Sequence, residues 1–264
     1  MTVCRDLGLA VSLAVLAATP ALAGSLPAVS GVNGKVAAAG GIEDGDGGAL
    51  SEASLSLPLG HAFGFQADGL LGYIGGQKYE VAAGNGHLFW RDPSIGLLGA
   101  YAGVTSFGGE SFYRYAGEGQ LYFDRISLEG LFGHDVSDLD DGLFWLGQLA
   151  YYPSDDLRVS AGLRYANWRD DRLAGPGRAA FAGVEYQAAS TPDYGLSLFA
   201  EGRSDGGGYN SVWGGVRVYF GGDKTLIRRH REDDPGVVIP MVSDVDVDMP
   251  IPDPPVIPFN PEED

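Results

Sequence analysis

The chain has 264 residues, a net charge of −18 and 42 glycines. Because so acidic a chain repels the phosphate backbone, its charge argues against nucleic acid as a partner. The only cysteine is Cys4, so the chain beyond the first segment has no disulfide, no thiolate metal ligand and no cysteine nucleophile.

Residues 1–23 have the pattern of an export signal. The apolar run from Leu7 to Ala18 is too short to span a bilayer, and the small residues that end at Ala23 form a cleavage site. No later stretch approaches the length of a membrane-spanning helix. The exported chain is therefore expected in the periplasm, in the outer membrane or outside the cell.

Twelve segments after the signal alternate apolar and polar residues at every second position. In residues 157–165, one face reads Leu, Val, Ala, Leu and Tyr, and the other reads Arg, Ser, Gly and Arg. A strand sends successive side chains to opposite faces, so one face meets an apolar environment and the other a polar one. Each segment has about 9–13 residues, which suits a tilted strand that crosses hydrocarbon. The segments are 33–43, 49–58, 62–74, 80–90, 94–106, 111–123, 125–135, 142–152, 156–168, 178–188, 194–203 and 210–220.

Short turns and looser, Gly- and Asp-rich connections alternate along the chain. The short turns include residues 91–93 and 124–125, and the looser connections include 135–141 and 169–177. This alternation, together with an even number of strands, is typical of a membrane barrel with both termini on the periplasmic side. Aromatic residues gather near the short turns, as in a girdle at the headgroup boundary: Trp90, Tyr122, Phe123, Tyr151, Tyr152, Tyr186, Tyr219 and Phe220.

The two faces of the predicted strands decide between a soluble β-fold and a membrane barrel. Glycine and alanine occupy many apolar-face positions, and a soluble core built from such small residues would pack thinly. Lipid chains conform to an uneven surface, so the apolar face is expected to point outward. The sequence therefore predicts an all-β, antiparallel transmembrane β-barrel of about 12 strands over residues 24–221.

The polar face is expected to line the lumen, the space that the strands enclose. Basic and acidic side chains occur there together: Arg114, Glu118, Glu129, Arg158, Arg164, Glu185, Glu201 and Arg217. Charges in a narrow space are costly unless they are paired or hydrated. Two hypotheses follow, a nearly closed barrel crossed by ion pairs and a narrow water-filled pore. The predicted loops are too short to form a substantial plug.

Residues 222–264 form an acidic, proline-rich tail. From Glu232 onward there are ten acidic residues and no basic residue, and eight prolines lie between Pro235 and Pro261. Because proline blocks strand pairing, we expect a disordered periplasmic extension. The alternative is a segment that docks a periplasmic partner or returns to the barrel mouth. The basic cluster Arg228–Arg231 would contact lipid phosphates or offset the acidic run.

The last predicted strand, residues 214–220, resembles the assembly signal of Gram-negative outer-membrane β-barrels. In that group a glycine precedes alternating hydrophobic residues that end in an aromatic, and Gly215, Val218 and Phe220 match. The chain thus looks like a member of the broad porin-like group. The resemblance implies contact with outer-membrane lipids and insertion by the barrel-assembly machinery. It departs from the usual pattern because 44 residues follow Phe220.

A catalytic site is the competing prediction, because some outer-membrane barrels hydrolyse lipids. The one candidate is His134, with Asp135, Ser137 and Asp138 nearby, and a polar loop explains this group better. The acidic residues of 135–141 lack the spacing of an EF-hand. We therefore predict no catalytic residue, metal site or cofactor. The predicted function is a narrow porin-like channel or a structural membrane component, with an outer-membrane lipid hydrolase or a surface-binding barrel as alternatives.

Overall fold

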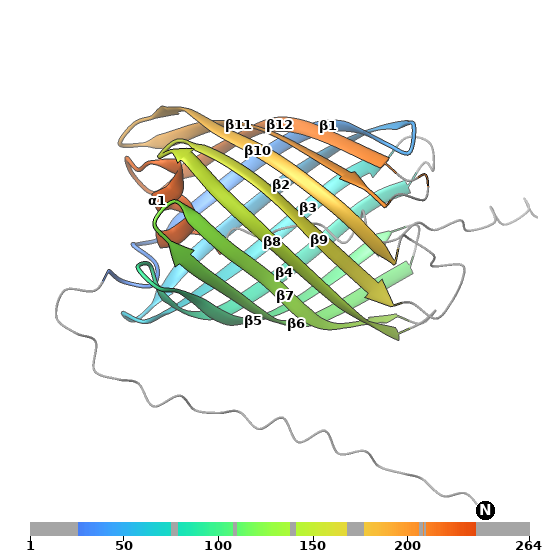
Figure 1. The fold of residues 1–264 in the computed structure, drawn as a ribbon, viewed down its shortest axis with the longest axis horizontal. Coiled ribbons are helices and arrows are strands. Elements are labelled where there is room, and N and C mark those ends of the chain that lie inside the picture. Colours follow the sequence, from blue (N-terminus) through green and yellow to red (C-terminus); the bar gives the residue numbers. More distant parts are fainter. Residues whose placement is uncertain are drawn as a thin grey trace, which may run out of the picture.

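In a computed structural model, the chain forms one antiparallel β-barrel followed by a short helix (Figure 1). The structure describes residues 26–74, 79–107, 110–137, 141–167, 177–205, 208 and 210–235. The strands are β1 Asn33–Glu43, β2 Asp46–Leu59, β3 Phe63–Ile74, β4 Tyr79–Asp92, β5 Gly96–Phe107, β6 Glu110–Phe123, β7 Ile126–Ser137, β8 Asp141–Ser154, β9 Leu157–Asn167, β10 Arg178–Ser190, β11 Tyr194–Ser204 and β12 Asn210–Phe220. The helix is α1, Leu226–Glu232.

Each strand pairs with its neighbours in sequence, and β12 closes the barrel against β1. At this seam Gly34 lies opposite Phe220, and Glu43 lies opposite Ser211. Closure leaves no unpaired strand edge, as a hydrocarbon environment requires. The predicted 12-strand barrel is confirmed, and the predicted strand ends lie within about three residues of the observed ones.

Tight turns occur at both rims of the barrel. At one rim, here called the inner rim, β6 and β7 are joined by a two-residue turn in which Asp124 has a φ of 42°. At the opposite, outer rim, the turn between β1 and β2 is equally tight, with a φ of 47° at Asp44 and 91° at Gly45. Positive φ at both central positions is typical of a hairpin turn that follows the twist of the strands. Most of the predicted longer connections lie wholly or partly outside the described residues.

The outside of the barrel is apolar. Leu71, Val212 and Phe132 are 65%, 64% and 62% exposed, which would be unfavourable in water for so many large side chains. The predicted outward residues Tyr113, Leu121 and Leu198 are also exposed. The surface of the barrel wall therefore suits contact with lipid hydrocarbon, as predicted.

Three of the predicted girdle aromatics point inward instead of outward. Tyr122, Tyr152 and Tyr219 are buried, whereas Phe123 and Phe220 beside them are exposed. The reason is the strand geometry, since consecutive residues must face opposite sides. The expectation of one outward girdle was wrong for these three tyrosines, and they instead contact the segment that contains α1.

The helix α1 lies at the inner rim (Figure 1). It begins after Thr225, and Arg228 forms an i,i+4 ion pair with Glu232. Seven residues are too few for a stable isolated helix, so its contacts with the barrel must hold it. Within the described part of the chain, no helix is long and apolar enough to cross a membrane.

Candidate functional site: the lumen and its inner mouth

Two terminal segments lie across the inner mouth of the barrel. The first, residues 26–32, packs Val29 against Phe89 and Leu97 of the wall. The Nη1 group of Arg91 donates a hydrogen bond of 3.2 Å to the carbonyl oxygen of Ala28. These contacts cover the side of the mouth formed by β4 and β5.

The second segment, residues 221–235, covers the opposite side of the mouth. The backbone N–H of Ile227 donates to the carbonyl oxygen of Asp155 at 3.0 Å, which ties α1 to the β8–β9 turn. Arg229 is fully buried, and its Nε donates to the Oε1 of Gln187 on β10 at 2.7 Å. Leu226 is fully buried as well.

Contacts of the second segment continue around the rim to β6 and β7. Arg231 donates from Nη2 to the carbonyl oxygen of Ile126 at 3.0 Å, and its guanidinium lies 5.0 Å from the ring centre of Tyr122. Beyond α1, the side chain of Gln120 donates to the carbonyl oxygen of Pro235. Residues 221–235, which we call the mouth segment, thus contact the wall on several sides.

Residues 26–32 and the mouth segment are also joined to each other. The hydroxyl of Ser30 donates to Oδ1 of Asp233 at 2.6 Å, and Lys224 forms an ion pair with the same carboxylate. Burial raises the pKa of Asp233 above its usual value. Lys35 on β1 pairs with Asp234. Together the two segments form a closure of the inner mouth.

His230 is the buried centre of this closure. The hydroxyl of Tyr219 donates to Oε1 of Glu185 at 2.7 Å, so it can accept from the Nε2–H of His230 at 3.1 Å. The hydroxyl of Tyr152 can then donate to Nδ1 at 3.0 Å. A neutral imidazole satisfies both contacts, and burial lowers the pKa of His230 to about 3.

Above the mouth, the lumen wall carries a buried network on β2, β3, β4 and β6. The ring of His87 lies 3.0 Å from Oδ2 of Asp68 and 2.9 Å from Oε2 of Glu118. Asp68 also accepts a hydrogen bond from Gln66, which in turn accepts one from Ser56. This network fills one side of the lumen with paired polar groups, as buried charges require.

Three of the predicted lumen arginines form ion pairs with carboxylates of the wall. Arg114 makes a bidentate contact with Asp135 at 2.6 and 2.7 Å, and its guanidinium stacks 3.8 Å from the ring centre of Phe144. The remaining pairs are Arg158 with Glu129 at 3.2 Å and Arg217 with Glu185 at 2.6 Å.

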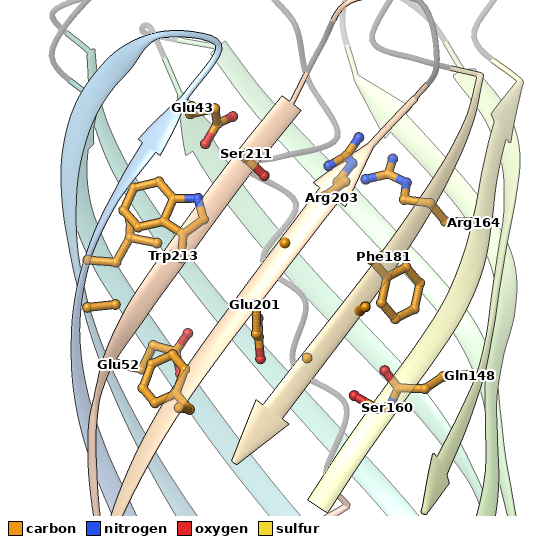
Figure 2. Close-up of a pocket in the computed structure, with 16 residues that line it drawn as sticks. Glu43, Glu52, Gln148, Ser160, Arg164, Phe181, Glu201, Arg203, Ser211 and Trp213 are labelled. Atoms are coloured by element: carbon orange, nitrogen blue, oxygen red, sulfur yellow. The ribbon is translucent and has the colours of Figure 1, made fainter.

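Beside these pairs lie an outer and an inner cavity that are both lined by Glu201. The outer cavity has a volume of about 100 Å³, and the inner one about 30 Å³. Figure 2 shows Arg164, Arg203 and Glu43 above Glu201 around the outer cavity. The inner cavity reaches His230 and Asp234 of the mouth segment. One cavity therefore lies in the outer half of the lumen and the other lies next to the closure, with Glu201 in the lining of both.

The eight residues predicted to line the lumen all lie on the inner side of the wall. Arg114, Glu118, Glu129, Arg164 and Glu185 are buried, Arg158 and Arg217 form the pairs described above, and Glu201 faces both cavities. The pairing partner of Glu118 was missed, because His87 comes from a strand that is not its neighbour.

Sequence reasoning also missed residues at the two ends of the lumen. Trp213 lines the outer cavity. It lies four residues before Arg217 in β12 and so on the same face of the strand, which is the signal that could have placed it inside. Arg91, predicted in a turn, lies one residue before the end of β4 and is buried in the mouth. The segment 26–32 shows no alternation, so no pattern indicated its role.

The predicted assembly-signal residues lie at the barrel seam. Gly215 faces inward, and a Cβ there would lie 2.1 Å from the carbonyl oxygen of Ala38. Val218 and Phe220 lie opposite Val36 and Gly34 on β1. The close approach at Gly215 gives this glycine a structural role at the point where the barrel closes.

The competing catalytic group is dispersed by the strand geometry. His134 and Asp135 are consecutive in β7, and Asp135 points inward to Arg114. The ring of His134 instead lies 3.8 Å from Asp141 at the outer rim. Asp138 lies outside the described residues. Asp135 therefore lies on the opposite side of the strand from the His134 ring.

Comparison with known proteins gives the fold. Neither a protein-family model nor a curated protein matches the chain. Among solved structures, a KdgM porin matches with a TM-score of 0.52 and 13% identity, over 69% of this chain and 97% of that one. A NanC porin matches with a TM-score of 0.53 and 13% identity, over 72% of this chain and 100% of that one. The translocator domain of the autotransporter NalP from Neisseria meningitidis matches with a TM-score of 0.52 and 15% identity, over 72% of this chain and 87% of that one. The chain has the fold of the Gram-negative outer-membrane porin-like β-barrels as a broad group.

Proposed function

We propose that the protein is a narrow porin-like channel of the outer membrane with a charged lumen. The observation that carries the proposal is the pair of cavities lined by Glu201, one in the outer half of the lumen and one beside the mouth segment. Their lining includes basic and acidic groups, such as Arg164 and Glu52. Such a lining would favour small hydrated solutes over apolar ones.

The orientation is part of the proposal. Short turns and both terminal segments lie at the inner rim, and in outer-membrane barrels this arrangement is typical of the periplasmic side. The inner mouth would then face the periplasm. Insertion by the barrel-assembly machinery, with Gly215, Val218 and Phe220 in the recognised strand, completes the proposal.

Planar-bilayer conductance of truncated chains tests this function. A chain ending at Gly222 lacks α1, whereas a chain ending at Pro235 keeps the mouth segment and is the matched control. We expect a higher steady conductance from the shorter chain, because the contacts that close the inner mouth are gone. If the shorter chain inserts and folds but conducts no ions, the protein is a closed structural component of the membrane.

Charge reversal in the lumen tests whether the cavities form the conducting path. In the shorter chain, Arg164→Glu changes the lining of the outer cavity, and Arg158→Glu changes the inner one. Both variants should shift the ratio of cation to anion permeability toward cations. Unchanged selectivity in both would show that ions take another route.

A further inference from the structure

A groove of about 490 Å³ lies on the outside of the barrel wall, near the inner rim. It crosses β4, β5, β6 and β7, and large apolar side chains line it: Trp90, Ile95, Leu98, Leu121 and Leu128. Each of these side chains is at least 37% exposed, so they face the surroundings of the barrel and not the lumen. The groove is therefore part of the apolar surface that suits lipid hydrocarbon.

Glycines form the floor of the groove. Gly119 on β6 lies directly opposite Gly130 on β7, and both line the groove. Neither glycine has a positive φ, and a Cβ at position 119 would lie 3.8 Å from its nearest neighbour, which is an ordinary contact. The barrel itself therefore has room for a side chain at Gly119. The missing side chain leaves space outside the wall.

Large side chains bound the floor on two sides. Toward the inner rim, Leu121 and Leu128 are cross-strand neighbours. Toward the outer rim, Phe132 follows Gly130 on the same face of β7 and lies opposite Trp145 of β8. The groove is thus a depression between two apolar ridges. A flexible apolar chain can fill such a depression and contact both ridges.

The groove extends to the inner rim, where the polar ends of lipids would lie. Gly119 is four residues before the end of β6, which is about 14 Å along the strand. Ile95, at the other end of the groove, belongs to the β4–β5 turn. Trp90 also lines this end, and its indole N–H suits the boundary between hydrocarbon and headgroups. An acyl chain in the groove would therefore place its headgroup beside the rim.

Charges at the rim indicate the kind of headgroup. Arg125 in the β6–β7 turn pairs with Asp155 at 3.0 Å, and both side chains are exposed. Because an exposed pair of this kind contributes little, Arg125 can exchange this partner for a phosphate group. Arg231 lies beside the same turn and donates to the carbonyl oxygen of Ile126 at 3.0 Å. At the end of β4 the charge is that of Asp92, which would repel a phosphate, so the anion belongs near Arg125.

From these positions we propose that the groove binds one acyl chain of a phospholipid whose phosphate contacts Arg125. A phospholipid combines an apolar chain with an anionic group at its end, as the groove and Arg125 together require. The groove is also continuous with the lipid-facing wall, so this occupant is present wherever the barrel is inserted. The assignment to the periplasmic leaflet rests on the orientation proposed above, whereas the site itself does not depend on conduction.

Native mass spectrometry of the full chain, refolded in detergent and titrated with lipid, tests the site. The probe is dipalmitoyl phosphatidylglycerol, and dipalmitoyl glycerol is the matched lipid without a phosphate. Gly119→Leu fills the groove. Gly84→Leu is the control, because Gly84 lies on the same face of β4 as the exposed Leu88, is outside the groove lining, and has nothing within 4 Å of an added Cβ. Arg125→Gln removes the charge at the rim and leaves the groove open. Circular dichroism verifies that each variant is folded.

We expect the wild type and Gly84→Leu to bind one phosphatidylglycerol with the same affinity, and Gly119→Leu to bind it about tenfold more weakly. Arg125→Gln should weaken phosphatidylglycerol by up to about fivefold and leave dipalmitoyl glycerol unchanged. Equal affinities in Gly119→Leu and Gly84→Leu would overturn the proposal, and so would equal loss of both lipids in Arg125→Gln. Wild-type dimers that disappear in Gly119→Leu would assign the groove to a second copy of the chain instead. None of these measurements needs an ion current, so a failure of the proposed channel would leave them unchanged.

Discussion

At the scale of single residues, His230 couples the closure of the inner mouth to pH. It lies between the hydroxyls of Tyr152 and Tyr219, with Glu185 3.7 Å away. Lys35 and Asp234 also face this group, as lining residues of the same cavity. The geometry suits a neutral ring, and the lowered pKa of about 3 means that protonation favours release of the mouth segment.

We predict that the mouth segment opens more often as the pH falls from 7 to 4.5. The free imidazole has a pKa of about 6.5. Below that pH, each unit by which the pH falls lowers the equilibrium constant for docking of the mouth segment by up to about tenfold through His230. The raised pKa of Asp233 acts in the opposite direction, because its docked carboxyl gains a proton more readily as the pH falls. Hydrogen exchange of the α1 amides, corrected for the intrinsic rate at each pH, measures the opening.

The variant His230→Gln isolates the contribution of the imidazole. Glutamine can keep a hydrogen bond to either tyrosine but does not titrate, so the acid-induced opening should be lost or reversed in sign. Equal pH dependence in the wild type and in this variant would assign the effect to other groups.

The buried pair of Arg114 and Asp135 carries a second prediction at this scale. Asp135→Asn removes the carboxylate from a side-chain pair that is only 7% and 1% exposed, and breaking such a pair costs about 3–5 kcal/mol of unfolding free energy. Asp155→Asn is the control, because the Arg125–Asp155 pair is 42% and 57% exposed and contributes about 0–1 kcal/mol. Urea unfolding in lipid vesicles compares the two, and similar losses would contradict the prediction.

At the scale of elements, alternation along the strands contains most of the information about the fold. In β9 it places Arg158 and Arg164 inside and Leu163 outside, which the structure shows. Alternation shows which face of the strand a residue lies on. It does not show which residues of other strands lie at the same height along the barrel axis, because that depends on the stagger of all strands. The contact between Glu118 and His87, from strands that are not adjacent, could therefore not be predicted.

The mouth segment shows the limit of local patterns. In isolation Leu226–Glu232 is too short to be helical, and proline and acidic residues follow it. The fully buried positions of Leu226 and Arg229 show that contacts with the finished barrel stabilise this helix. The sequence left open whether the tail extends from the barrel or returns to its mouth. Residues 221–235 return to the mouth, where tertiary contacts hold them.

The β12–β1 seam provides a prediction about barrel closure. Gly215→Ala would place a Cβ 2.1 Å from the carbonyl oxygen of Ala38, so the strands must separate or shift. At the neighbouring Gly214 the nearest atom would lie at 3.5 Å, an ordinary contact. We expect Gly215→Ala to reduce stability by about 1–3 kcal/mol and Gly214→Ala to have little effect.

Refolding into lipid vesicles in the absence of other proteins measures this difference. Such a system excludes recognition of the last strand by the assembly machinery, so a lower yield of folded Gly215→Ala would reflect packing at the seam alone. Equal yields for the two variants would show that the seam can absorb the extra methyl group.

At the scale of the whole molecule, the barrel has its polar and apolar sides arranged in the opposite way to a soluble protein. Ion pairs and buried tyrosines line the lumen, while large apolar side chains cover the outside. Its stability should therefore depend on hydrocarbon around the wall. Substitutions that introduce charge on the outside should be costly in proportion to their depth in the membrane.

Leu198 tests this arrangement because it is 52% exposed and lies near the middle of β11. In lipid vesicles Leu198→Arg should cost about 2–4 kcal/mol, whereas Tyr194→Arg at the strand end should cost about 0–1 kcal/mol. Denaturant titrations of vesicle-bound protein measure both values. Similar small costs at the two positions would mean that water, and not lipid, surrounds the middle of the wall. The depth dependence thus tests the membrane assignment directly, and the proposed channel rests on that assignment.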